Sequence, residues 1–457
     1  MIAIQNQSAF SKGSLQIVDA YYDIRSGFTG SPATFSIAGY SGSEPITIQN
    51  MPEEQLGAVY GFSDGSFAQI SYADEKSLGS VPNTNGLSSS IFVTRNLNYA
   101  FSASQSSHVL TMVNLANGGS YPLSLPGVYR VSVNPGSSMA IAFVQNSNYA
   151  YYPQILTTNQ SISYSGGPST WPKAAVDCEP QNLPTVCLFQ AQSPDAIDST
   201  GTYYGAPLQF DRPVKAVFSA DGGTAYILNC GPECGGNNAS VSVLPVAPFI
   251  FLLGKSSGLM PCNLASVASC PNKNAAPFTN IPVPGGASNA LVDSSTMYVV
   301  GQKLMPDNFF GGYLTVLNLQ TNSVVPSTAS SPNPVSISDG VPGGPSRMVE
   351  GDDNTLWISM TKCDQGERFN HSLPYGCVTM YNTSTSQVNQ LLPYQGDGTG
   401  LAAVTGLHKL YSAQGGQVYI NSTVDGTSMD NQFVTVTGTA YDVAYMDAAS
   451  DADNTVY

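Results

Sequence analysis

Charged residues are scarce in this sequence, and basic residues are the scarcest. Asp, Glu, Lys and Arg make up 10% of the 457 residues, against roughly 25% in an average soluble protein. Fifteen basic and 30 acidic side chains give a formal net charge of −15. Because nucleic-acid binding depends on neutralising phosphates with Lys and Arg, we expect no nucleic-acid partner.

Long apolar runs and helical patterns are also missing. The longest apolar stretch, Val243 to Gly254, contains two prolines and is shorter than the roughly 20 residues that cross a bilayer. The opening residues MIAIQNQSAFSKG do not resemble a signal peptide, so an exported protein would be present here in a mature or trimmed form. The 44 Gly and 31 Pro supply frequent turns, which short strands require. These features predict an all-β protein.

A three-part pattern recurs along the chain. A lead-in strand precedes an aromatic-centred strand, which we expect to be a buried inner strand, and a strand of alternating polarity follows it. The aromatic-centred copies include GTAYILN (223–229), STMYVVG (295–301), NTLWISM (354–360) and HKLYSAQ (408–414). Short antiparallel strands repeated every 40 to 60 residues or so predict a β-propeller. A β-sandwich would lack the fixed order of strand types, and a parallel β-helix would have shorter repeats.

We therefore predict one propeller domain over residues 1–457, with four-stranded antiparallel blades. Counting the aromatic-centred strands gives eight blades, with seven possible. Inserted loops are expected at about 152–210 and 247–280, and longer loops at 303–312 and 362–376.

Two stretches resemble the YVTN-type propeller repeats of bacterial and archaeal secreted or surface proteins. They are RPVKAVFSADGGTAYILNCGPECGGNNASVSVLPV (212–246) and the unit from 285 to 325. In both, a D-G or D-S turn leads into the aromatic-centred strand, and a V-x-V-L strand follows. The resemblance implies the fold and a secreted or surface setting, and it carries no activity.

The two ends of the chain complement each other. Residues 440–457 contain a lead-in and an inner strand without a partner, and residues 1–27 continue an inner strand and add an alternating one. We expect these half-blades to close the ring as one shared blade, which removes a free sheet edge. Alternatively, they could pair between molecules and build a filament or sheath by strand addition.

Eight cysteines fall into four pairs that are close in sequence: Cys178/Cys187, Cys230/Cys234, Cys262/Cys270 and Cys363/Cys377. Such pairs predict four disulfides and an oxidising compartment. Zinc at Cys230 and Cys234 is the competing interpretation, but no second ligand pair follows at a suitable distance. N-x-S/T triplets, which are possible glycosylation sites, begin at Asn6, Asn159, Asn238, Asn370, Asn382 and Asn421.

No catalytic constellation is visible. The three histidines, His108, His371 and His408, belong to different repeats. Asp447, Asp451 and Asp453 are calcium candidates, because closely spaced carboxylates supply oxygen ligands, and a solvated turn is the alternative. No other cofactor is expected. SADGG (219–223) resembles the Asp-box of sialidase propellers, but Tyr226 stands where that motif has Trp.

Aromatic and histidine side chains in loops are the candidate binding residues, because aromatic rings with polar tips suit protein interfaces and sugar stacking. They are Tyr151, Tyr152, Tyr203, Tyr204, Phe309, Phe310 and His371. We predict an extracellular, periplasmic or cell-surface protein that binds a protein or a glycan, or that associates with itself. A propeller hydrolase or lyase acting on polysaccharide or lactone is the alternative.

Overall fold

The described part of the computed structural model covers most of the chain in two compact units. Unit 1 comprises Met1–Asn83, Tyr298–Val316 and Val325–Tyr457, and unit 2 comprises Thr84–Met297 and Leu317–Val324. The structure describes residues 2–5, 13–20, 34–37, 45–51, 55–61, 65, 67–81, 90–156, 175–179, 185–197, 203–246, 279–338, 345–361, 363, 376–391, 395–434 and 436–446.

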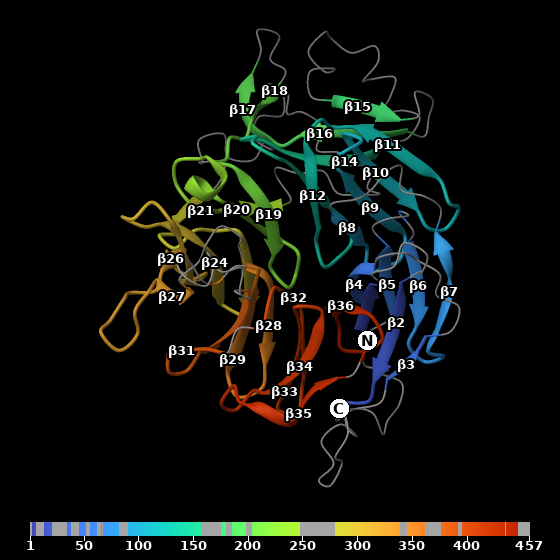
Figure 1. Ribbon diagram of the computed structural model, residues 1–457. Helices are drawn as coiled ribbons and strands as arrows, with labels where there is room; N and C mark the ends of the chain where they lie inside the picture. Colours follow the sequence, from blue (N-terminus) through green and yellow to red (C-terminus); the bar gives the residue numbers. More distant parts are fainter. Residues whose placement is uncertain are drawn as a thin grey trace. The chain divides into compact units, whose positions relative to one another are not determined.

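Antiparallel sheets follow one another in chain order (Figure 1). The first contains β4 (Pro45–Met51), β5 (Leu56–Gly61), β6 (Phe67–Ser71) and β7 (Lys76–Val81). The second contains β8 (Ser90–Val93), β9 (Tyr99–Ser104), β10 (Val109–Asn114) and β11 (Ser120–Ser124). The third contains β12 (Val128–Val133), β13 (Ala140–Val144), β14 (Ala150–Leu156), β15 (Ala175–Glu179) and β16 (Thr185–Gln190).

The remaining sheets repeat this plan. A hairpin of β17 (Gln192–Ile197) and β18 (Tyr203–Pro207) precedes the sheet of β19 (Pro213–Phe218), β20 (Thr224–Asn229), β21 (Ser240–Pro245) and β22 (Thr279–Pro282). Next come β23 (Asn289–Asp293), β24 (Thr296–Leu304), β25 (Phe310–Asn318), β26 (Ser323–Val324) and β27 (Val335–Ser338). The last consecutive sheets are β28 (Pro345–Gly351), β29 (Thr355–Met360), β30 (Cys377–Asn382) and β31 (Gln387–Gln390), then β32 (Gly398–Val404), β33 (Lys409–Gln414), β34 (Gln417–Ser422) and β35 (Ser428–Val434).

Seven blades are thus built from consecutive strands, and a further sheet combines strands from both ends of the chain. That sheet has the order β3–β2–β1–β36, with β1 (Ile2–Gln5), β2 (Ser14–Val18), β3 (Thr34–Ser36) and β36 (Thr439–Val443). Ile2 pairs with Val443, and its side chain is fully buried. The chain is therefore an all-β single propeller with antiparallel four-stranded blades, as the sequence predicts.

The turn between the first and second strands has the same local geometry in each consecutive blade. At least one residue there adopts a positive φ between 53° and 70°, the left-handed region that tight turns need. These residues are Gln55, Leu97, Ser137, Gly222, Ser294, Asn354 and His408. The recurrence of one conformation at seven positions with six residue types shows that the turn geometry, and not one residue type, defines the repeat.

The aromatic-centred strands are buried, but they are not the innermost strands. They are the second strands of their sheets, such as β20, β29 and β33. The lead-in strands instead pack on lead-in strands of neighbouring sheets: β8, β12, β19 and β23 in unit 2, and β28, β32, β36 and β4 in unit 1. The expectation of aromatic inner strands is wrong on this point, because strong burial on both faces marks the second position of the sheet.

The expected insertion at 152–210 contributes regular structure. β14 pairs with β16, and β16 pairs with β15, so part of this segment widens the third blade to five strands. The second expected insertion, 247–280, lies outside the described residues except at 279–280. Among the described residues, no helix is long and apolar enough to cross a membrane.

Candidate functional site

The best-defined exposed loops of unit 2 are rich in side-chain amides. They connect the second and third strands of successive blades, at 105–108, 145–149 and 230–239. Their exposed amide residues, here called the amide surface, are Gln105, Gln145, Asn146, Asn148, Asn237 and Asn238.

The loop after β20 is shaped by a disulfide and a glycine. Cys230 and Cys234 are bonded, with their Cα atoms 5.6 Å apart, and they enclose a 3-10 turn at Gly231–Cys234. Gly231 has a φ of 66°, and a Cβ there would lie 2.3 Å from the backbone nitrogen of Ala239. A side chain at this position would therefore force the loop apart.

Asp211 holds the end of that loop. Its carboxylate accepts hydrogen bonds from the backbone N–H groups of Asn237, at 3.0 and 3.1 Å, and Asn238, at 2.7 Å. Charge-assisted bonds of this kind are stronger than neutral ones. The carboxylate is thus occupied by the backbone, and the neighbouring amides remain on the surface.

The same connecting segment also fixes the loop after β13. The backbone N–H of Arg212 donates to Asn148 Oδ1 at 3.4 Å, and its Nη1 donates to the carbonyl of Asn146. The backbone N–H of Phe210 donates to the carbonyl of Asn148 at 2.8 Å. One short segment therefore orders two loops at once.

A side-chain contact extends the amide surface to the loop after β9, where Gln105 Nε2 donates to Gln145 Oε1. The nearby Tyr151 ring is half-buried, and burial raises the pKa of its hydroxyl. Neutral amides beside an aromatic ring offer paired donors and acceptors, which suit a polyhydroxylated or peptide ligand better than an ion.

The aromatic residues predicted to bind are divided between core and surface. Tyr152 is buried at 4% exposure and stacks on Phe189 with ring centroids 5.7 Å apart, a position that does not fit the expected binding role. Phe309 is 50% exposed at the turn of the β24–β25 hairpin, and Phe310 beside it is half-buried. Tyr203 and Tyr204 lie in β18. His371 lies outside the described residues.

The predicted disulfides form at three of the four pairs: Cys178–Cys187, Cys230–Cys234 and Cys363–Cys377. Cys262 and Cys270 lie outside the described residues. Because Cys230 and Cys234 are bonded to each other, they are not present as the thiolates that a zinc site would need. Three disulfides indicate an oxidising, non-cytoplasmic compartment.

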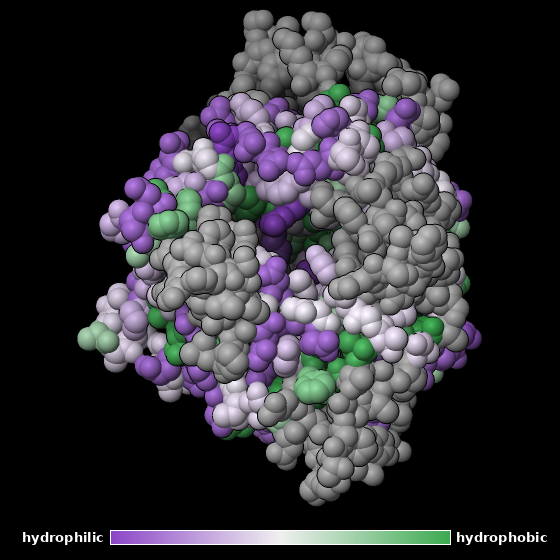
Figure 2. All heavy atoms as spheres, in the orientation of Figure 1, coloured by the Kyte–Doolittle hydropathy of each residue, from purple (hydrophilic) through white to green (hydrophobic). Residues whose placement is uncertain are grey.

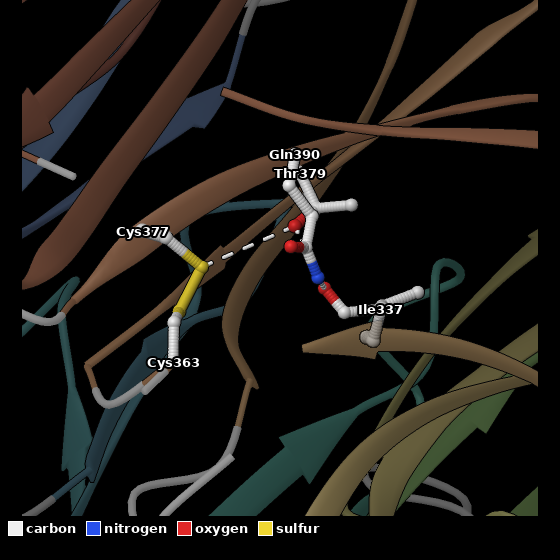
Figure 3. Close-up of a disulfide and its surroundings, with 5 residues drawn as sticks. All are labelled: Ile337, Cys363, Cys377, Thr379 and Gln390. Atoms are coloured by element: carbon white, nitrogen blue, oxygen red, sulfur yellow. Dashed lines mark hydrogen bonds between the residues drawn. A yellow bond between two sulfur atoms is a disulfide. The ribbon is translucent and has the colours of Figure 1, made fainter. Parts of the chain in front are cut away.

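The Cys363–Cys377 bond begins the third strand of its blade (Figure 3). Both sulfurs belong to fully buried residues. Next to it, Thr379 Oγ1 at 3.0 Å and Gln390 Nε2 at 2.8 Å both donate to the carbonyl of Ile337. The disulfide thus closes its loop beside a hydrogen-bonded tie between β27 and the sheet of β28–β31.

The possible glycosylation sites differ in exposure. Asn238 is exposed and Asn382 is half-exposed. Asn421 is 6% exposed and donates from Nδ2 to the carbonyl of Gly426 at 3.3 Å, so this side chain does not fit the role of an acceptor. Asn6, Asn159 and Asn370 lie outside the described residues.

The calcium candidates Asp447, Asp451 and Asp453 also lie outside the described residues. Within the described part of the chain, no three His, Cys, Asp or Glu side chains are grouped as metal ligands. His408 lies in a turn, where its Nδ1 is 2.8 Å from Asp353 Oδ2. That contact ties the β28–β29 turn to the β32–β33 turn.

An ion pair between a partly exposed arginine and a buried aspartate lies on the innermost strands of unit 1. Asp442 in β36 is 3% exposed, and its Oδ2 lies 3.1 Å from Nη2 of Arg347 in β28. Burial raises the pKa of Asp442, and the Arg347 charge and the N–H groups of Ile48 and Val443 act against that rise. Gly400 makes room for the carboxylate, because a Cβ there would lie 2.7 Å from Asp442 Oδ1.

Sequence reasoning missed both Asp211 and Asp442, because each acts through partners distant in sequence. The only local signal for the amide surface is the density of Asn and Gln in the loops, for example GGNNAS at 235–240.

Comparison with known proteins does not identify a family for this chain. No family model matches the chain, and no curated protein matches it. Hydrazine synthase of Kuenenia stuttgartiensis is similar in structure, with a TM-score of 0.44 and 10% identity over 90% of this chain and 93% of that one. The β-propeller domain of Cps50 (Swd1) of Myceliophteria thermophila has a TM-score of 0.43 and 10% identity over 84% of this chain and 98% of that one. At these values neither likeness carries an argument about this chain. The propeller fold rests on the chain's own sheets, and membership of the YVTN-type family is not confirmed.

Proposed function

We propose that this protein is a binding propeller of an extracellular, periplasmic or cell-surface compartment, and that it recognises a neutral glycan or glycoprotein through the amide surface. The observation that carries the proposal is the double anchoring of these loops by Asp211 and Arg212. Loops that are ordered before binding lose little further conformational entropy when a ligand docks.

The chemistry of the surface supports this choice of ligand. Amide groups both donate and accept, so they match the hydroxyl pairs of a sugar ring, and exposed Asn146 and Gln145 bring no net charge. The carboxylate of Asp211 is bonded to two backbone N–H groups, which makes it an anchor for the loop and not a candidate acid or base.

The pairing of β36 with β1 in one chain supports ring closure within the molecule over strand exchange between molecules. We accordingly propose that the protein works as a closed propeller and not as a filament subunit. Light scattering of the purified protein tests this point, since strand exchange would give a mass that rises with concentration.

A neutral-glycan array with the full chain tests the binding proposal. We expect saturable binding that falls at least tenfold in the double variant Gln145→Ala/Asn146→Ala. Gln320→Ala, which removes an exposed amide from the turn after β25, is the matched control and should bind as the parent does. Absence of binding across the array, or equal loss in the control, would overturn the proposal. Release of cleaved product from a bound polysaccharide would instead place the protein among hydrolases or lyases.

A further inference from the structure

The polar surface of this protein depends on uncharged side chains. Hydrophilic residues are spread over the described part of the face in Figure 2, although Asp, Glu, Lys and Arg make up only 10% of the chain. An amide that becomes a carboxylate therefore changes the charge of this surface more than it would on an average protein. The chemistry of an exposed asparagine depends on the residue that follows it.

Asn117 is followed by a glycine, in the turn that joins β10 to β11. Both Asn117 and Gly118 are exposed. The sequence has one other Asn-Gly pair, at 85–86, which lies outside the described residues. In such a pair the backbone nitrogen of the glycine can attack the carbonyl carbon of the asparagine side chain. Glycine has no side chain to obstruct that attack.

The turn fixes the carbonyl group that would react. Asn117 Oδ1 accepts the backbone N–H of Gly119 at 2.8 Å, so a donor already faces the oxygen on which negative charge develops when Cγ is attacked. A donor fixed at that oxygen favours the addition. The N–H of Gly118 donates to the carbonyl of Asn114 at 2.8 Å, and this bond must open before the nitrogen can react. The reaction should therefore run in the folded protein, but more slowly than in an unfolded chain.

The turn between β34 and β35 already carries the product of such a reaction. Asp425 precedes Gly426 there, and its Oδ1 accepts the backbone N–H of Thr427 at 3.1 Å and the Thr427 hydroxyl at 2.7 Å. The hydroxyl and the N–H of Thr427 lower the pKa of Asp425. The glycine has a positive φ in both turns, 70° at Gly118 and 78° at Gly426. The fold thus accommodates an aspartate at this position of a turn.

Asn96 provides a matched comparison within the same chain. Its Oδ1 accepts the backbone N–H of Asn98 at 3.1 Å, and the N–H of Leu97 donates to the carbonyl of Thr94 at 2.9 Å. Leu97 also has a positive φ, 54°, and Asn96 is exposed like Asn117. The two turns therefore share these bonds and differ in the side chain of the next residue, which at Leu97 obstructs the attack.

We propose that Asn117 is a site of spontaneous deamidation in the folded protein. The backbone nitrogen of Gly118 loses its proton to solvent and forms a bond to Asn117 Cγ. The Cγ–Nδ2 bond then breaks and releases ammonia, which takes a proton from water. Water opens the resulting cyclic imide at either of its carbonyls and gives aspartate or isoaspartate. The net reaction consumes one water, releases one ammonia and replaces a neutral amide with a carboxylate.

This site is independent of the amide surface. The reacting turn follows β10, whereas the loop at 105–108 precedes that strand. Glycan binding through the amide surface should therefore be the same before and after the reaction, and either proposal can fail without the other.

Peptide mass spectrometry of the full chain, kept folded at pH 6 and at pH 9, tests the site. We expect Asn117 to gain the mass difference between an amide and an acid, at least tenfold faster than Asn96, with fragment ions locating each change. Both aspartate and isoaspartate should form. The rate should rise with pH, because the attacking nitrogen must lose its proton. Leu97→Gly, which places a glycine after Asn96, should bring that asparagine close to the rate of Asn117.

Thermal unfolding shows whether Leu97→Gly folds, and if it does not, the comparison of Asn117 with Asn96 in the parent decides the result. Asn117→Asp is the standard for the product and should melt as the parent does. Reaction of Asn117 only in the urea-unfolded chain would overturn the proposal, and so would an equal rate at Asn96. Aspartate without isoaspartate would also overturn it, because direct hydrolysis of the amide gives aspartate alone.

Discussion

The carboxylate of Asp442 accepts a hydrogen bond from the backbone N–H of Ile48 at 2.9 Å, although 394 residues separate the two in the chain. The same oxygen lies 3.1 Å from Arg347. One buried oxygen thus connects the first strands of three sheets in unit 1, namely β4, β28 and β36.

Removal of the cation from this connection should destabilise the protein. Arg347→Met leaves the Asp442 carboxylate buried without its counter-ion, and we expect a loss of about 3 kcal/mol in the free energy of unfolding, because uncompensated buried charges are costly. Urea unfolding measures this loss. Lys76→Met, which breaks an exposed pair with Asp74, should change stability far less, and equal effects would contradict the assigned role.

The pairing of β1 with β36 makes a second stability prediction. Ile2 is fully buried in a cluster with Ala402, Tyr411, Val434 and Val443, so Ile2→Ala should cost about 2 to 4 kcal/mol. Val424→Ala, at a side chain that is 62% exposed, provides the control and should be nearly neutral. Parent-like chemical unfolding of Ile2→Ala would mean that β1 contributes little to the terminal sheet.

The contact between His408 and Asp353 predicts a pH dependence. The hydrogen bond and charge of Asp353 raise the pKa of His408. Burial acts to raise the pKa of Asp353, but hydrogen bonds from Thr423 and His408 outweigh it and lower that pKa. The contribution of His408 to the free energy of unfolding is fully present below its unfolded pKa of about 6.5, and it is lost as pH rises through the raised folded pKa. The contribution of Asp353 to the same free energy is lost as pH falls below about 4.

His408→Gln should therefore lower the melting temperature more at pH 5.5 than at pH 9. Both side chains are near the surface, so salt and solvent weaken the pair, and we expect a shift on the order of 1 °C. Differential scanning calorimetry at the two pH values measures it. A shift of the same size at both values would show that the histidine charge plays no part.

The disulfide that closes the longer loop should stabilise the protein more, although the effect grows only with the logarithm of loop length. Cys363 and Cys377 are separated by 14 positions, and Cys230 and Cys234 by 4. The chain-entropy model then gives about 3 kcal/mol for the first bond and about 2 for the second. Double Cys→Ala variants and thermal unfolding compare the two, and a larger loss for the Cys230–Cys234 variant would show that loop strain or packing dominates.

Exposure predicts which acceptor asparagine can be modified. In a host that glycosylates N-x-S/T triplets, we expect a glycan at exposed Asn238 and none at buried Asn421. Peptide mass spectrometry of the secreted protein reads both positions in one experiment. Occupancy at Asn421 would mean that modification precedes the folding of β34.

Local sequence signals predicted the strands and the disulfides well. The order of lead-in, aromatic-centred and alternating strands follows from burial, which the residue pattern records directly. Tyr152 was misplaced because the chain continues as β14, and there burial against Phe189 depends on a strand that begins 33 positions later, at 185. The local sequence identifies Tyr152 as an aromatic residue, but it does not show that Phe189 packs against its ring.

The parts of the site that could not be predicted depend on long-range contacts. Asp211 acts on Asn237 and Asn238, 26 and 27 positions away, and nothing in its local sequence distinguishes it from a turn aspartate. The same is true of Asp442 and its partner Ile48. These groups come together only in the folded chain, so their partners can be identified only once the pairing of the strands is known.

The position of Asn333 has a consequence for the behaviour of the protein in concentrated solution. Its Oδ1 accepts the backbone N–H of Val316 at 2.9 Å, and its Nδ2 donates to the carbonyls of Val316 and Val325 at 2.9 and 2.7 Å. The Asn333 side chain thus bonds both backbone groups of Val316 in β25, as a neighbouring strand would, in the part of β25 between its pairings with β26 and β27. Asn333→Ala would leave these backbone groups without their side-chain partner, and we expect that variant to associate more readily with another polypeptide than the parent does.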